Sequence, residues 1–266
     1  MAVDVTDALR QLMPWVSAAA LAMGRPTGAA LVLPVFTRAQ LGGAARGALA
    51  FALGLAMMPA LARALPATSL SSVSLLLLGA KELIIGLVIG VLVGVPIWSV
   101  QCVGEILDTQ RSATQDKQPE PNSGNQDSTT ATFLGITVVA LFVISGGLGA
   151  LARTIDDSYV AWPVLQLMPS VSRDWIPFGF GVLDRITATS LALAAPVMLG
   201  MLLCEMCVIL LMRAVPKLQL YDLAPTLRNL MFILMMFGYA SWLVTYMRAG
   251  INQIRGVDAA LTALLR

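Results

Sequence analysis

Long apolar stretches separated by short polar linkers dominate the pattern of this chain. A helix that crosses a membrane needs about 20 mostly apolar residues, and six stretches reach roughly this length. They lie at about Leu12–Phe36, Gly47–Leu65, Val73–Val100, Thr132–Ala152, Ile186–Met212 and Asn229–Met247. The pattern predicts an all-α, multi-helix integral membrane protein built from hydrophobic helical hairpins, and prolines inside two stretches, Pro96 and Pro196, predict kinks in them.

Composition supports this class and excludes others. Of 266 residues, 58% are hydrophobic and 12% are charged, whereas a soluble domain has about 45–50% apolar and about 25% charged residues. A net charge of +2 is too small to favour nucleic-acid binding. Histidine is absent, which removes the commonest general base and metal ligand. Asp4 and Asp7 precede the first basic residue, so we expect the first stretch to be an uncleaved membrane segment.

The linkers differ in character. The third linker, about Gln101–Ala131, is the longest polar stretch, and its centre has the composition of a mobile loop. The fourth linker, about Arg153–Arg185, mixes aromatic residues with prolines and predicts amphipathic pieces near lipid headgroups or against a partner.

After Arg248, apolar residues recur at a spacing that suits one helical face. If all six stretches crossed the membrane, the basic residues of the linkers and termini, with Arg63 at the end of the second stretch counted among them, would divide eight to seven between the two sides, so the positive-inside rule assigns no orientation.

Glycines recur on one face of the third apolar stretch. Gly86, Gly90 and Gly94 stand four residues apart, and Ala20, Gly24 and Gly28 form a similar stripe in the first stretch. Because such a face has almost no side chains, another helix backbone can approach it closely. The spacing therefore predicts close helix packing.

Lys81 and Glu82 are adjacent inside the third apolar stretch. Leu83–Val100 alone is eighteen residues, about 27 Å of helix, so the two charges could lie at the membrane interface. They could equally lie within the span, where each costs about 2.5–3.5 kcal/mol without partners. Adjacent helical residues project about 100° apart, so we expect Lys81 and Glu82 to need separate partners.

Two other charges pose the same problem. Arg25 precedes Pro26 in the first stretch, and Glu205 is flanked by apolar residues on both sides. Intramembrane charges indicate a buried contact to another helix or subunit, or an ion pathway. The pair Cys204–Cys207 lacks the second ligand pair that a metal site needs. The chain carries no recognisable catalytic motif, so we expect no catalytic residues, no cofactor and no metal.

Four segments, in order, carry a family resemblance. They are "GRPTGAALVLPVFTRAQLGGAARGALAFAL", "GAKELIIGLVIG", "VGEILDTQRSA" and "RAVPKLQLYDLAPTLRNLMFIL". Together they resemble the flagellar and type III secretion export-apparatus family that includes FliR and SctT. The stretch Pro216–Tyr221 departs from the "PQ-x-N" character of the flagellar members, and this favours the injectisome branch.

The resemblance implies a subunit of an export gate in the bacterial inner membrane. Such a subunit assembles with several copies of two smaller membrane proteins into a closed helical assembly around a pore for unfolded proteins. It also implies an N-terminal part, 1–185, and a C-terminal hairpin with an amphipathic tail, 186–266. A loop at about 104–130, with Gly104, Asp108, Gln110 and Arg111, would help to plug the closed gate.

A competing hypothesis is an ion-coupled small-molecule transporter. It would use Lys81, Glu82 and Glu205 at kinked helices. The gate hypothesis instead expects these charges, together with Arg25, to make buried contacts within an assembly.

Overall fold

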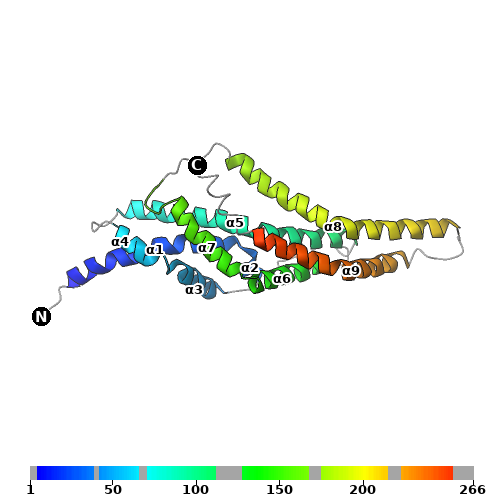
Figure 1. Cartoon of the computed structure of the whole chain (residues 1–266), viewed down its shortest axis with the longest axis horizontal. Coiled ribbons are helices and arrows are strands. Elements are labelled where there is room, and N and C mark those ends of the chain that lie inside the picture. Colours follow the sequence, from blue (N-terminus) through cyan, green and yellow to red (C-terminus); the bar gives the residue numbers. More distant parts are fainter. Residues whose placement is uncertain are drawn as a thin grey trace, which may run out of the picture. The chain divides into compact units, whose positions relative to one another are not determined.

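The computed structural model describes residues 5–38, 42–65, 71–111, 128–167, 175–214 and 223–253. These residues form helices and no strand (Figure 1). The helices are α1 (Val5–Val32), α2 (Pro34–Arg38), α3 (Gly43–Gly54), α4 (Met58–Ala64), α5 (Ser72–Gln110), α6 (Thr129–Ile144), α7 (Gly147–Ala161), α8 (Trp175–Ala214) and α9 (Ala224–Gln253). The all-α prediction is confirmed.

Only three of these helices are long and apolar enough to cross a membrane unbroken. They are α5, α8 and α9, and the number rises to five if each of two bent pairs counts as one span. Helix α1, which covers most of the first apolar stretch, is not among them. Among the described residues, three to five spans therefore correspond to the six apolar stretches of the sequence.

The two bent pairs explain part of this difference. Helices α3 and α4 meet at 63°, and α6 and α7 meet at 70°. The second bend lies at Ser145–Gly146, where Gly146 takes a left-handed φ of 77° that ends α6. Hydropathy does not register a single glycine in this conformation, so Thr132–Ala152 reads as one continuous stretch in the sequence.

Helix α5 is longer than the apolar pattern predicts. It continues to Gln110, so Gly104, Asp108 and Gln110 lie on its last turns and Arg111 follows directly. The expectation that these residues belong to a loop is wrong. Gly104 allows the start of α6 to lie directly on this helix, because a Cβ at position 104 would meet the backbone of Thr130 and Ala131. The centre of the expected plug-like loop, 112–127, lies outside the described residues.

The chain divides into two compact units. One comprises Met1–Gly94, Gly146–Phe180 and Asn252–Arg266, and the other comprises Val95–Ser145 and Gly181–Ile251. Helices α5 and α8 contribute to both units. The functional division into 1–185 and 186–266 stays a prediction. The apolar face expected after Arg248 extends mostly beyond the described residues, since these end at 253.

In the first unit, α1 and α5 pack backbone against backbone. A Cβ on Gly86 would meet the carbonyl carbon and oxygen of Arg25, and one on Gly90 would lie 2.9 Å from the carbonyl oxygen of Ala29. From the other side, a Cβ on Gly28 would meet the backbone of Leu83 and Leu87. Both helices therefore need glycine where they cross.

The glycine contact gives a testable prediction. Gly86→Ala should destabilise the protein by about 1–3 kcal/mol, because its methyl group has only rigid backbone to displace. Gly79→Ala is the matched control on the same helix, since no atom of the described residues lies within 4 Å of a Cβ at Gly79; it should stabilise α5 by about 0.5–1 kcal/mol. Thermal unfolding of the purified protein in detergent measures both, and equal midpoints for the two variants would contradict this packing.

Candidate functional site

Three charged side chains are buried together in the first unit. Arg25 comes from α1, and Lys81 and Glu82 come from α5; their side chains are 0%, 9% and 0% exposed. The guanidinium Nε of Arg25 donates to Oε2 of Glu82 at 2.6 Å, and Nη2 lies 3.4 Å from Oε1. Gly24 makes room for this contact, because a Cβ there would lie 2.5 Å from the Cβ of Glu82.

The adjacent charges Lys81 and Glu82 also pair with each other. Nζ of Lys81 lies 2.8 Å from Oε1 of Glu82. The expectation that helical geometry keeps them from pairing well is wrong, because the long lysine side chain can curve back to a neighbouring carboxylate. Glu82 therefore neutralises one unit of the two positive charges around it.

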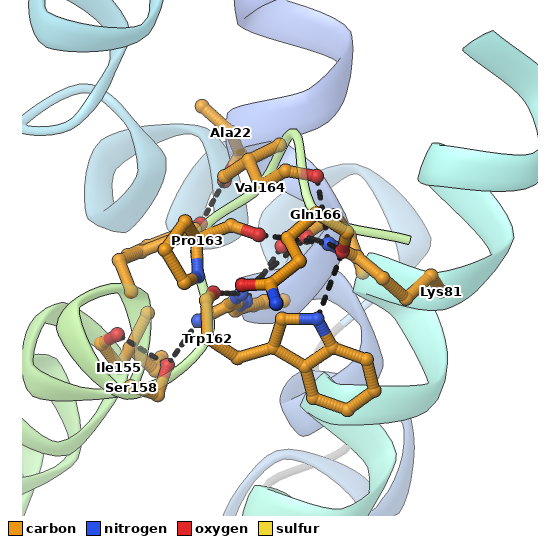
Figure 2. Close-up of polar contacts among 11 residues, drawn as sticks. Ala22, Lys81, Ile155, Ser158, Trp162, Pro163, Val164 and Gln166 are labelled. Carbon is orange, nitrogen blue, oxygen red and sulfur yellow. Dashed lines mark hydrogen bonds and ion pairs between the residues drawn. The ribbon is translucent and has the colours of Figure 1, made fainter. Parts of the chain in front are cut away.

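Backbone carbonyl groups balance the remaining positive charge. Nη2 of Arg25 donates to the carbonyl oxygen of Trp162. Nζ of Lys81 contacts three more carbonyl oxygens, those of Pro163 at 3.2 Å, Val164 at 2.7 Å and Gln166 at 3.0 Å (Figure 2). These groups follow the carboxyl end of α7, where a helix carries partial negative charge.

The turn at 163–166 is closed by its own bonds as well. The backbone N–H of Gln166 donates to the carbonyl oxygen of Pro163 at 3.1 Å, and Nε1 of Trp162 donates to the carbonyl oxygen of Gln166 at 2.9 Å. The ring of Trp162 also lies 5.4 Å from Nζ of Lys81, within range of a cation–π contact. Lys81 therefore binds a turn that is already shaped to present carbonyl groups.

Pro26 connects α1 to α7 through a missing hydrogen bond. Proline has no N–H, so Pro26 leaves the carbonyl oxygen of Ala22, four residues earlier, without its helical donor. The hydroxyl of Tyr159 on α7 donates to this oxygen at 3.0 Å. The ring of Tyr159 also lies 4.1 Å from Cζ of Arg25, and Ser158 accepts from Nη1 of Arg25 at 2.8 Å. Arg25 and Pro26 thus each contribute a polar tie to α7.

Glu205, the fourth charge singled out in the sequence, lies in the second unit. It pairs with Arg228 of α9 at 2.5 Å, and the two side chains are 36% and 18% exposed, respectively. Its neighbour Cys204 lies 3.7 Å from the carbonyl oxygen of Leu227. Glu205 is therefore a half-exposed tie between α8 and α9 and takes no part in the buried cluster.

Asp108 forms a separate polar site in the second unit. Its carboxylate accepts from the backbone N–H of Thr130 at 2.8 Å and from the Thr130 hydroxyl at 2.6 Å. Arg111 donates to it at 2.7 Å and lies 4.1 Å from the ring of Phe232. Asp108 therefore satisfies an N–H group in the first turn of α6 and fastens α6 to the end of α5.

Sequence reasoning missed several members of these sites. Ser158, Tyr159 and the carbonyl groups after α7 are far from Arg25 in the chain, and no short motif joins them. Pro26 could have indicated an acceptor in need of a donor, but not which residue supplies it. Arg228 is the only charged residue of α9 before Arg248 and was a fair candidate to pair with Glu205.

The arrangement of the buried cluster suits holding helices together. Nζ of Lys81 has four oxygen contacts, and Arg25 bonds to groups on two other segments. Within the described residues, no group of three or more acidic or cysteine side chains could hold a metal ion. The cluster therefore ties α1, α5 and the end of α7 into one body.

The buried carboxylate gives a second prediction. Glu82→Gln should cost about 3–5 kcal/mol of stability, because it leaves two buried cations without a counter-charge. Glu205→Gln is the matched control, as the same change at a partly exposed pair should cost about 0–1 kcal/mol. Denaturation in detergent compares the two variants; a cost for Glu82→Gln no larger than that of the control would contradict the proposed role of the cluster.

The orphaned carbonyl gives a third prediction, tested with a double-mutant cycle. Tyr159→Phe should cost about 1–3 kcal/mol, because the carbonyl of Ala22 loses its donor. In a Pro26→Ala background the helix supplies its own N–H, so the same change should cost clearly less. Tyr239→Phe is the control, since the Tyr239 hydroxyl has no hydrogen-bond partner among the described residues. Equal costs in both backgrounds would show that Pro26 and Tyr159 are independent.

Comparison with known proteins identifies the family to which the chain belongs. Bacterial export proteins, family 1, match residues 16–254. The chain is 31% identical to Yop proteins translocation protein T of Yersinia pestis, over 81% of this chain and 83% of that protein. It is 29% identical to surface presentation of antigens protein SpaR of Salmonella typhimurium, over 85% and 84%, and 24% identical to secretion system apparatus protein SsaT of that bacterium, over 85% and 87%. The chain therefore belongs to family 1 of the bacterial export proteins, the type III export-apparatus family that includes FliR and SctT, and is a multi-pass protein of the bacterial inner membrane.

Proposed function

We propose that this protein is a structural subunit of the membrane export gate of a type III secretion apparatus, where it forms part of the path of unfolded proteins. The observation that carries the proposal is the family match over residues 16–254, together with the three unbroken apolar helices. The similar proteins are named for translocation of Yop proteins, for surface presentation of antigens and for a secretion system apparatus. These names favour the injectisome branch over the flagellar branch.

The apolar helices support a role inside an assembly. Half of the most apolar window of α5 is buried within the chain, against 22% for α8 and 17% for α9. Large side chains such as Leu203, Ile233 and Phe237 are 64%, 61% and 88% exposed. Large apolar side chains exposed along helices of membrane-spanning length need lipid or other membrane subunits to cover them. A hetero-oligomer of membrane subunits satisfies this requirement.

The buried cluster supports a conduit over an ion-coupled transporter. Coupling an ion to transport needs an ionisable group that can exchange its partner for the ion. Lys81 and Glu82 instead are engaged with each other, with Arg25 and with backbone carbonyl groups. In this proposal the subunit is not an enzyme, and the energy for export comes from elsewhere in the apparatus. The plug-like role of the segment at about 104–130 is part of the same proposal.

An in-frame deletion tests the proposed function. Deletion should abolish secretion of every substrate of the apparatus, because the path itself would be incomplete, and a wild-type copy should restore it. Secreted proteins in the culture medium are the measurement, and intracellular substrate levels are the control for expression. The purified protein alone, in liposomes, should move no small solute under an ion gradient. Normal secretion by the deletion strain would contradict the gate, and gradient-driven solute flux would support the transporter.

A further inference from the structure

In the segment that follows α7, polar backbone groups face the protein interior and apolar side chains are exposed, which is the opposite of an ordinary surface turn. Four of its backbone carbonyl groups, from Trp162 to Gln166, accept from Arg25 or Lys81, while its exposed side chains, apart from the polar Gln166, are apolar. The side chain of Val164 is buried, at 5% exposed, whereas those of Leu165 in the turn and Leu167 after it are 42% and 48% exposed. Exposed turns usually carry Gly, Asn, Asp or Ser. An apolar turn held rigidly by buried cations is therefore a surface shaped for a neighbour.

The outward face of α7 continues this surface. Arg153, Asp156, Asp157 and Val160 stand at the three- and four-residue spacing of one helical stripe, and all four are exposed. Val160 is 83% exposed and lies one turn from both aspartates. The opposite face of α7, including Ile155, Ser158 and Tyr159, is buried. The stripe carries two negative charges and one positive charge beside exposed apolar side chains.

Lipid does not suit this combination. A charged side chain within hydrocarbon costs about 2.5–3.5 kcal/mol, and residues three or four apart on a helix are only about 5–6 Å from each other at Cβ. Acyl chains on Val160 would therefore also cover Asp156 and Asp157. Anionic headgroups would repel the same two carboxylates. A protein neighbour that brings apolar side chains and a cation satisfies both parts of the surface.

We propose that Asp156, Asp157, Val160 and Leu165 form a docking surface for a helix of another membrane subunit, one with an apolar face flanked by Lys or Arg. Arg25 and Lys81 act as positioning residues, because they hold the carbonyl groups of the turn and so fix where Leu165 points. This inference rests on the proposed function in that the partner is a subunit of the same apparatus.

Charge reversal at the stripe tests the surface. Asp156→Lys/Asp157→Lys should lower co-purification of the other membrane subunits with the tagged protein by at least about tenfold, a factor that corresponds to 1.4 kcal/mol. Arg153→Glu is the matched control, since it changes charge on the same face in the opposite sense and should leave co-purification unchanged or increase it. Equal losses for both variants, or none for the double variant, would overturn the proposal.

A second variant distinguishes loss of the contact from misfolding of the subunit. Asp156→Asn/Asp157→Asn keeps the shape of two exposed side chains, so the isolated subunit should keep its melting temperature while co-purification falls by an intermediate amount. Full co-purification of this variant, together with an unfolded charge-reversal variant, would count against the surface.

Crosslinking tests the occupant directly. A photo-reactive phenylalanine at position 160 or 165 of the assembled apparatus should crosslink to another membrane subunit, at a peptide that contains Lys or Arg, as identified by mass spectrometry. Asp156→Lys/Asp157→Lys should remove the crosslink. Products with lipid only, or with a second copy of this chain, would overturn the proposed partner.

The two proposals fail in different ways. If deletion of the chain leaves secretion intact, the proposed function is wrong. If deletion abolishes secretion but the charge-reversal variant assembles and secretes normally, the function stands and the docking surface is wrong.

Discussion

A single buried carboxylate organises the first unit of this protein. Glu82 is fully buried and lies between the guanidinium of Arg25 and the ammonium of Lys81. Removing charges from water is costly unless they are paired and hydrogen-bonded, and here the one acid serves two bases. The cations remain in excess, and the carbonyl groups at the end of α7 supply what is missing. The carboxyl end of α7 is therefore an electrostatic partner of Arg25 and Lys81, and these contacts fix its position against α1 and α5.

The glycine crossing and the ion cluster depend on each other. Gly24 and Gly86 allow α1 and α5 to approach so closely that backbone contacts backbone. At a wider separation Arg25 could not place two nitrogens on the carboxylate of Glu82, and the charges would face lipid or water. Close packing thus sets the distance at which the buried charges become tolerable. In return, the ion pairs fix the register of the two helices, which a smooth glycine face alone leaves weakly defined.

The sequence was informative where the signal is local and misleading where it depends on distant partners. Helix content and the apolar segments followed from hydropathy, and Arg25, Lys81, Glu82 and Glu205 stood out because their surroundings are apolar. The pairing of Lys81 with Glu82 was not predictable from helical geometry alone, since it depends on how the lysine side chain bends. The 70° corner depends on one left-handed glycine, and the close approach of α6 to the end of α5 depends on Gly104. No periodicity records either feature.

The order of the cluster residues along the chain has a consequence for biogenesis. Arg25 is separated from Glu82 by 57 residues and from Trp162 by 137. At about 5–20 residues per second of synthesis, the arginine emerges several seconds before its counter-ion and longer still before the carbonyl groups that complete its shell. During that time α1 carries an unpaired charge and has no α5 to pack against. Helix α1 therefore gains its packing partners only after later segments arrive, so this unit completes its assembly late, although its first helix is made first.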